Sequence, residues 1–335
     1  MREVAYTDVV DAQGRIASLI HRTPLLRCSS LAQELDCLLW FKCEHFQRTG
    51  SFKFRGASNA VLSLPAEVAE RGVVTHSSGN HGQALARAAA MRGVPAYVVM
   101  PQGAVQSKAE AVTAFGAKLI RCADTLADRE RTAAEVQRAT GAHFVHPYDD
   151  ARVIAGQGTV GLELLQQLPE VDVVVAPVGG GGLLSGVCLA IHEHHPRVRI
   201  FAAEPRGADD AARSLRSGVR QSLDRACTVA DGLRAQLSDR TFTILRQHLE
   251  DVVVVDDAAI VRSMRLLWHR TKWVVEPSAA IAFAALCEPS LLRQCRGRNV
   301  VVILTGGNVD LDSLPWVNPT RQELQQKQER EKEGP

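Results

Sequence analysis

Residues 171–186 read VDVVVAPVGGGGLLSG, and this stretch decides the fold class. The β-branched run at 171–175 has the composition of a buried strand, and the glycines lead into a helical run over residues 183–192. A glycine loop between a parallel strand and a helix points backbone N–H groups at one spot, with the positive end of the helix dipole behind them. The stretch therefore predicts an anion cradle that is suited to a phosphate.

Short β-branched runs alternate with Ala- and Leu-rich helical runs along the rest of the chain, which is the pattern of an α/β protein with mostly parallel sheets. One series predicts strands at 73–75, 96–100, 118–120 and 143–145, with helices at 83–90, 109–114 and 125–139. A second series predicts strands at 171–175, 199–203, 252–255 and 300–304, with helices at 183–192, 258–270 and 278–286. We expect a small domain inserted at 75–149 into a large domain made of residues 1–74 and 150–335.

Composition narrows the class of function. The 335 residues carry 39 Lys plus Arg against 37 Asp plus Glu, so no basic field is available for a nucleic acid. No stretch reaches the roughly 18 to 20 apolar residues that span a bilayer. The eight cysteines form no CxxC pair, and the N-terminal segment has no apolar core of a signal peptide. We therefore expect a cytoplasmic protein that acts on a small molecule.

Two further motifs accompany the glycines: SFKFRGA at 51–57 and SSGNHG at 77–82. Each also has an ordinary interpretation, because a lone lysine is usually a surface side chain and a Ser/Gly/Asn loop is usually a turn with a helix cap. The four glycines could also belong to a dinucleotide site, because Glu204 follows them at the distance expected of a ribose-binding acid. However, Leu184 stands where G-x-G-x-x-G requires its last glycine.

Eight motifs together, in chain order, resemble the serine racemase branch of the fold-type II enzymes that depend on pyridoxal phosphate (PLP), a group related to tryptophan synthase β and to the serine/threonine dehydratases. The resemblance runs from about residue 22 to 314 and excludes the dinucleotide interpretation. The motifs are SFKFRGA (51–57), HSSGNHGQALA (76–86), AGQGT (155–159), PVGGGGLLSG (177–186), AAEPRGADD (202–210), ADG (230–232), EPSAA (276–280) and LTGGNVDL (304–311).

The resemblance implies a role for each cofactor residue. Lys53 would hold PLP as a Schiff base and then act as the base on Cα–H, which requires a neutral amine. The phosphate would lie on Gly179, Gly180, Gly181, Gly182 and Leu183. Phe52 would pack on the ring, Asn80 would bond the ring oxygen, and Thr305 would face the pyridine nitrogen. A hydroxyl there cannot keep that nitrogen protonated, so the ring would be a weak electron sink.

The substrate residues implied by the resemblance are Ser77, Ser78, Asn80, His81 and Arg129. Ser78 would return a proton on the cofactor face opposite Lys53, which inverts the centre. Racemisation of serine, with accompanying β-elimination to pyruvate and ammonia, is therefore the expected activity. Hydroxyaspartate dehydratases of this branch carry the same SSGNH, so a dehydratase acting on serine, threonine or threo-3-hydroxyaspartate stays open. So does a catalytically silent PLP-fold protein that binds a partner in response to a nucleotide.

The resemblance also implies a metal site and a regulatory site. Glu204, Asp210 and the carbonyl of Ala208 match a divalent-cation site of oxygen ligands, suited to Mg²⁺, Ca²⁺ or Mn²⁺. Arg48, Thr49, Gln83 and Lys272 match an allosteric ATP site, although Arg48 replaces a lysine. Ala235-Gln236 replaces a serine pair of the animal racemases, which removes a hydroxyl from the substrate pocket. A homodimer is expected from the family.

Overall fold

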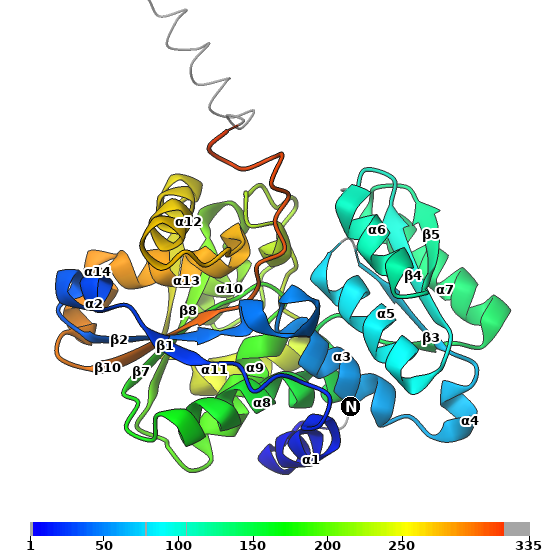
Figure 1. Ribbon diagram of the computed structural model, residues 1–335, viewed down its shortest axis with the longest axis horizontal. Coiled ribbons are helices and arrows are strands. Elements are labelled where there is room, and N and C mark those ends of the chain that lie inside the picture. The colour runs from blue at the N-terminus through cyan, green and yellow to red at the C-terminus, as the bar shows by residue number, and fades with distance from the viewer. Residues whose placement is uncertain (1–2, 78, 105, 318–335) are drawn as a thin grey trace, which may run out of the picture.

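The structure is a computed structural model that describes residues 3–77, 79–104 and 106–317, without the side chains of residues 106 and 107. Its strands form two separate sheets with helices on both faces (Figure 1). This confirms the predicted α/β class with two mostly parallel sheets.

The larger sheet has six strands in the order β1-β2-β10-β7-β8-β9. Only β1 runs antiparallel to its neighbour, and the remaining pairs are parallel. Its strands are β1 (Leu25–Arg27), β2 (Leu38–Cys43), β7 (Val173–Pro177), β8 (Arg199–Pro205), β9 (Asp251–Val255) and β10 (Asn299–Leu304).

The two faces of this sheet bury alternate residues of each strand. Along β10, Val300, Val302 and Leu304 enter one apolar core, whereas Val301 and Ile303 enter the other. Because each such side chain is removed from water, it contributes roughly 1.5–3 kcal/mol of hydrophobic stabilisation. The first core is completed by α12 (Asp257–Thr271) and α13 (Pro277–Cys287), and the second by α8 (Ala151–Gln167), α9 (Gly182–His192) and α11 (Asp239–His248).

The smaller sheet is all parallel, in the order β5-β4-β3-β6. Its strands are β3 (Val73–His76), β4 (Ala96–Pro101), β5 (Lys118–Cys122) and β6 (His143–Phe144). The helices around it are α5 (Asn80–Arg92), α6 (Gln106–Ala114) and α7 (Leu126–Thr140). The side chain of Thr125 caps α7 by accepting the N–H of Asp128, and Gly141 ends this helix with a φ of 70°.

Other helices of the described residues are α1 (Tyr6–Ile16), α2 (Ser29–Leu35), α4 (Ala66–Ala69), α10 (Asp210–Ser217) and α14 (Pro289–Cys295), with single turns at η1 (Glu44–Phe46), η2 (Arg48–Gly50), η3 (Arg206–Ala208) and η4 (Asp231–Leu233). Among the described residues, no helix is long and apolar enough to cross a bilayer.

Helix α3 (Lys53–Leu62) lies between the two sheets, where it packs on both α5 and α8 (Figure 1). A fully buried charge network fixes its first turn. Arg55 donates to both oxygens of Glu44 (2.8 and 2.8 Å) and to both oxygens of Glu163 (2.7 and 2.8 Å). The ammonium of Lys42 donates to Glu163 at 2.8 Å. Two cations therefore meet two carboxylates, which offsets the cost of taking these charges out of water.

Two ion pairs connect the part of the chain that carries the small sheet to the part that carries the large sheet. Lys108 on α6 donates to Asp231 in η4 at 2.5 Å. Arg240 on α11 donates to the carbonyl oxygen of Asp149 at 2.9 Å and to its carboxylate at 2.6 Å. The second pair anchors the segment that leads from β6 into α8.

Candidate active site

Lys53 is the first residue of α3, and the described residues place its side chain among several predicted site groups. Its Nζ donates to the carbonyl oxygen of Pro147 at 2.9 Å and lies 5.1 Å from the ring centre of Phe52. Burial lowers the pKa of this amine to about 8, against the opposing attraction of the Glu276 carboxylate. A substantial fraction is therefore neutral near physiological pH, as a nucleophile or a base requires.

The four glycines form the turn between β7 and α9. Gly181 is the N-cap of α9 with a φ of 85°, a left-handed conformation that disfavours any other residue. A Cβ on Gly180 would lie only 2.4–2.5 Å from three ring carbons of Tyr148. Leu183 follows as a buried residue of the first turn of α9. This is the predicted cradle, a loop without side chains at the positive end of a helix.

The loop at 77–82 joins β3 to α5. The hydroxyl oxygen of Ser77 accepts the N–H groups of Gly79 (3.3 Å) and Gly82 (3.1 Å), which shapes the turn. Ser78 lies outside the described residues. The side chain of His81 is 2% exposed, and neither ring nitrogen has a hydrogen-bond partner within the described part of the chain. Burial and the nearby Lys53 hold the pKa of His81 far below its usual value, so the ring is neutral.

Asn80, the first residue of α5, is held by two side chains from the other end of the sequence. Its Nδ2 donates to both carboxylate oxygens of Glu276 at 2.9 and 3.1 Å, and its Oδ1 accepts from Asn308 at 2.9 Å. Burial, together with the charge of Asp231, raises the pKa of Glu276 to about 7. Neither Glu276 nor Asn308 was assigned a role from sequence, although both lie in quoted motifs.

Thr305 follows β10 directly and is nearly buried. Its carbonyl oxygen accepts the N–H of Phe52 at 3.0 Å, which places the residue preceding Lys53 beside it. Its hydroxyl donates to the carbonyl oxygen of Ser278 on α13 at 3.4 Å. The structure thus brings the N-terminal end of α3 against the C-terminal end of β10.

Four helices begin in this region: α3 at Lys53, α5 at Asn80, α9 at Gly182 and α13 at Pro277. The contacts of Lys53 with Pro147, of Tyr148 with Gly180, and of Asn80 with Glu276 connect these starting points. Because each helix N-terminus carries a partial positive charge, the site favours an anionic ligand.

Arg129 lies in the first turn of α7, where its Nε donates to the carbonyl oxygen of Thr125 at 3.4 Å. Its positive charge contributes to the low pKa of His76, about 4, for which burial and His146 are the larger causes. The contact with Thr125 lies at the start of α7, and among the described residues Arg129 forms no hydrogen bond with the loop at 77–82.

The predicted metal residues lie at the junction of β8 and α10. The two oxygens of Glu204 accept the N–H groups of Ala211 and Ala212, each at 2.8 Å, and Asp210 accepts that of Leu237 at 3.1 Å. Burial, together with the charge of the neighbouring Asp210, raises the pKa of Glu204 to about 8. Ala208 is also buried. No cluster of three or more His, Cys, Asp or Glu side chains suited to a metal occurs in the described ranges.

The predicted ATP residues lie on three elements: Arg48 and Thr49 in η2, Gln83 in α5 and Lys272 at the C-terminal end of α12. Thr49 has a φ of 60°, and its carbonyl oxygen accepts from the same Asn308 that bonds Asn80. Buried atoms of Arg48 (Nε) and Thr49 (Oγ1) have no hydrogen-bond partner among the residues described. Gln83 is buried in α5, and Lys272 ends α12 with a φ of 63°.

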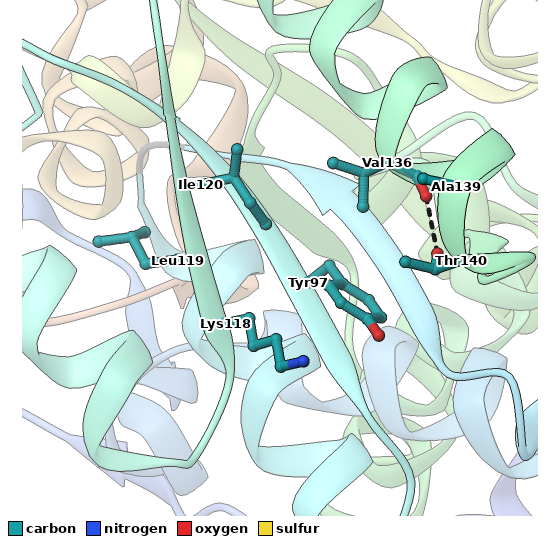
Figure 2. Close-up of a pocket in the computed structure, with 7 residues that line it drawn as sticks. All are labelled: Tyr97, Lys118, Leu119, Ile120, Val136, Ala139 and Thr140. Carbon is teal, nitrogen blue, oxygen red and sulfur yellow. Dashed lines mark hydrogen bonds between the residues drawn. The ribbon is translucent and has the colours of Figure 1, made fainter.

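A separate hollow of about 510 Å³ is lined by β4 and β5 of the small sheet and by α7 (Figure 2). Tyr97, Lys118 and Ile120 line it from the strands, and Thr140 lines it from α7. The hydroxyl of Thr140 donates to the carbonyl oxygen of Val136 at 2.7 Å. None of its seven lining residues is a predicted site residue, so this hollow is distinct from the candidate active site.

Comparison with known proteins gives a direct result. The profile of a family described as pyridoxal-phosphate dependent enzyme matches residues 16–306. The chain belongs to this PLP-dependent enzyme family. Among its relatives, a serine racemase from Arabidopsis thaliana is 48% identical over 91% of this chain and 93% of its own. A β-hydroxyaspartate dehydratase from Paracoccus denitrificans is 46% identical over 93% of this chain and 98% of its own.

A solved structure of this PLP-dependent family, that of maize serine racemase, superimposes with a TM-score of 0.90 at 43% identity. It covers 97% of this chain and 100% of that structure. The resemblance stated from the motifs is thereby confirmed, as are the α/β fold of the PLP-dependent enzymes and the dependence on PLP.

Proposed function

We propose that this PLP-dependent enzyme interconverts L- and D-serine and also eliminates water from serine to give pyruvate and ammonia. One observation supports this most directly. The amine of Lys53, with its pKa lowered to about 8, contacts the Pro147 carbonyl, and the ring of Tyr148, which follows Pro147, lies on the glycine cradle. The racemases among the relatives support the same activity.

The donor groups fit PLP. In the cradle, Gly179, Gly180, Gly181 and Gly182 have no Cβ in the way of a phosphate, and Leu183 follows them. Lys53 bonds Pro147, the residue before the Tyr148 that packs on Gly180. Phe52, Asn80 and Thr305 would hold the ring. When bound, PLP withdraws electrons from the Cα of an attached amino acid, which makes the Cα proton acidic.

Lys53 and Ser78 would divide the proton transfer. The Nζ of Lys53 takes the proton from Cα on one face, and the Ser78 hydroxyl returns a proton to the other. Ser77, Asn80 and His81 would receive the substrate carboxylate at the start of α5, with Arg129 near that end. Because the His81 side chain is buried, we assign its contribution to its backbone N–H.

Incubation of the holoenzyme with L-serine, with D-serine and pyruvate measured in one sample, tests the proposal. We expect both products in the wild type, loss of D-serine alone in Ser78→Ala, and loss of both, together with the visible band of bound PLP, in Lys53→Ala. A retained PLP band in Lys53→Ala would contradict the lysine assignment. Pyruvate without D-serine in the wild type would contradict racemisation.

A dehydratase acting on serine, threonine or threo-3-hydroxyaspartate is the second candidate. It is favoured by Ala235 and Gln236, which replace the serine pair of the animal racemases. Ala235 has no hydroxyl for a serine substrate, and the amide of Gln236 donates to the carbonyl of Leu223 at 2.6 Å. The relative from Paracoccus denitrificans supports it as well. A higher kcat/KM for hydroxyaspartate or threonine elimination than for serine conversion would favour this candidate.

We also propose that Glu204, Asp210 and the Ala208 carbonyl bind a divalent cation, Mg²⁺ or else Ca²⁺ or Mn²⁺. Hard oxygen donors suit these ions, and a cation would relieve two buried carboxylates whose pKa values are raised by burial. Chelation should then lower the melting temperature, and added Mg²⁺ should restore it. Glu204→Gln should abolish this response, and an unchanged melting temperature in the wild type would contradict the site.

Three further expectations stay proposals. ATP would bind near Arg48, Thr49, Gln83 and Lys272, and the Asn308 side chain offers a route from Thr49 to Asn80. A homodimer is supported by apolar side chains beside these residues, since Phe46 is 43% and Val274 45% exposed. The small domain, residues 75–149, would close on the substrate in a cytoplasmic enzyme.

A further inference from the structure

Tyr148 lies between the lysine and the glycine cradle, in the segment that leads from β6 to α8. Its own N–H and that of Asp149 donate to Nδ1 of His146 at 3.3 and 2.9 Å. Its ring meets the His146 ring edge to face, with 4.6 Å between centres and 84° between planes. Arg240 holds the next residue, Asp149, from α11. These contacts hold the main chain around Tyr148, and the His146 ring packs against the Tyr148 ring.

The ring lies against the cradle itself. A Cβ on Gly180 would come within 2.4 Å of Cγ and 2.5 Å of both Cδ atoms of Tyr148. A Cβ on Gly182 would lie 2.9–3.0 Å from the Cβ, Cα and carbonyl oxygen of the same residue. The Tyr148 ring therefore packs directly on the middle of the cradle, and any side chain at Gly180 would displace it.

The same segment reaches the amine at the other end of the site, because Lys53 donates to Pro147, the residue before Tyr148. Two consecutive residues thus contact both groups that would hold the two ends of the cofactor. An aromatic ring packed on a glycine of this loop keeps water from that part of the cradle, and hydrogen bonds to an anion are stronger where water is excluded.

We propose that the ring of Tyr148 covers the phosphate cradle and acts as a positioning residue that retains the cofactor through its phosphate. This inference rests on the proposed PLP site. The ring is the active part: within the described residues, no hydrogen bond is formed by its hydroxyl, whose pKa burial raises to about 12, so that the group stays neutral.

The test compares the dissociation constants of PLP and of pyridoxal, which lacks the phosphate, for the apoenzyme titrated by visible absorption. Tyr148→Ala should weaken PLP binding about tenfold and leave pyridoxal binding within about twofold of the wild type. Tyr148→Phe should bind both as the wild type does. Tyr97→Ala removes a tyrosine ring from the distant hollow and should change neither constant.

Equal weakening of PLP and pyridoxal in Tyr148→Ala would overturn the inference, since it would mean that the ring acts on the fold and not on the phosphate. Unchanged PLP binding would overturn it as well. Tyr148→Leu serves the same comparison if the alanine variant does not fold. Failure of the proposed PLP site can be told apart from failure of this inference. If the site itself were wrong, Lys53→Ala would keep the visible band of bound PLP, independently of the Tyr148 variants.

Discussion

Glu276 is a buried carboxylate whose pKa is raised to about 7 by its burial. Between its ordinary value of 4.5 and 7, the folded protein binds a proton there that the unfolded chain does not. The wild type therefore loses stability as the pH rises through this window, and the loss persists above pH 7. Glu276→Gln removes the charge and can still accept from Asn80.

We expect Glu276→Gln to raise the melting temperature at pH 8 by a few degrees, from a gain of up to about 3 kcal/mol, and to have no effect below pH 4.5. Thermal melts between pH 4.5 and 8.5 measure this. Glu67→Gln, at an exposed position on α4, is the control and should show no such trend. A variant less stable than the wild type at pH 8 would contradict the assignment.

At the scale of elements, the candidate site depends on the buried charge network that fixes the first turn of α3. Glu163→Ala on α8 leaves Arg55 and Lys42 short of an acceptor in a place that water does not reach. Breaking a buried pair in this way costs about 3–5 kcal/mol, which urea unfolding would measure. Glu135→Ala, at the exposed pair with Arg131, should cost less than about 1 kcal/mol. If Glu163→Ala and Glu135→Ala lowered the free energy of unfolding by similar amounts, the buried network would not be what stabilises the start of α3.

The sequence predicted the elements whose signal is local. The strands expected at 96–100, 118–120 and 300–304 appear as β4, β5 and β10 within two residues, because β-branched runs between turns need no partner to be recognised. The charge network was not foreseen, since Arg55 and Glu163 are 108 residues apart. The same holds for the contact of Tyr148 with Gly180, because nothing local indicates which loop a ring will cover.

At the scale of the whole molecule, the pair Lys108–Asp231 connects α6 beside the small sheet with η4 beside the large one. Its energy is modest, because the Asp231 side chain is 44% exposed and water screens the charges. If the pair closes the small domain over the substrate, Lys108→Ala and Asp231→Asn should each raise KM for L-serine by up to about fivefold, with an unchanged urea midpoint.

The double variant should be no worse than either single variant, because the second change finds no partner left to remove. Arg270→Ala breaks a pair with Glu34 that lies away from η4 and serves as the control, with an unchanged KM. Additive increases in KM would mean that the two side chains act separately, which would contradict a closing pair.

The four helices that begin at the candidate site have a consequence for how such a chain can diverge. Their positive ends belong to the main chain, and a substitution alters one side chain without deleting an aligned row of peptide dipoles. A lineage can therefore exchange the residues that select a substrate while the attraction for an anion persists. The amino acid that is bound as substrate can therefore differ between racemases and dehydratases of the family. The affinity for a phosphorylated cofactor is kept, because it depends on the backbone.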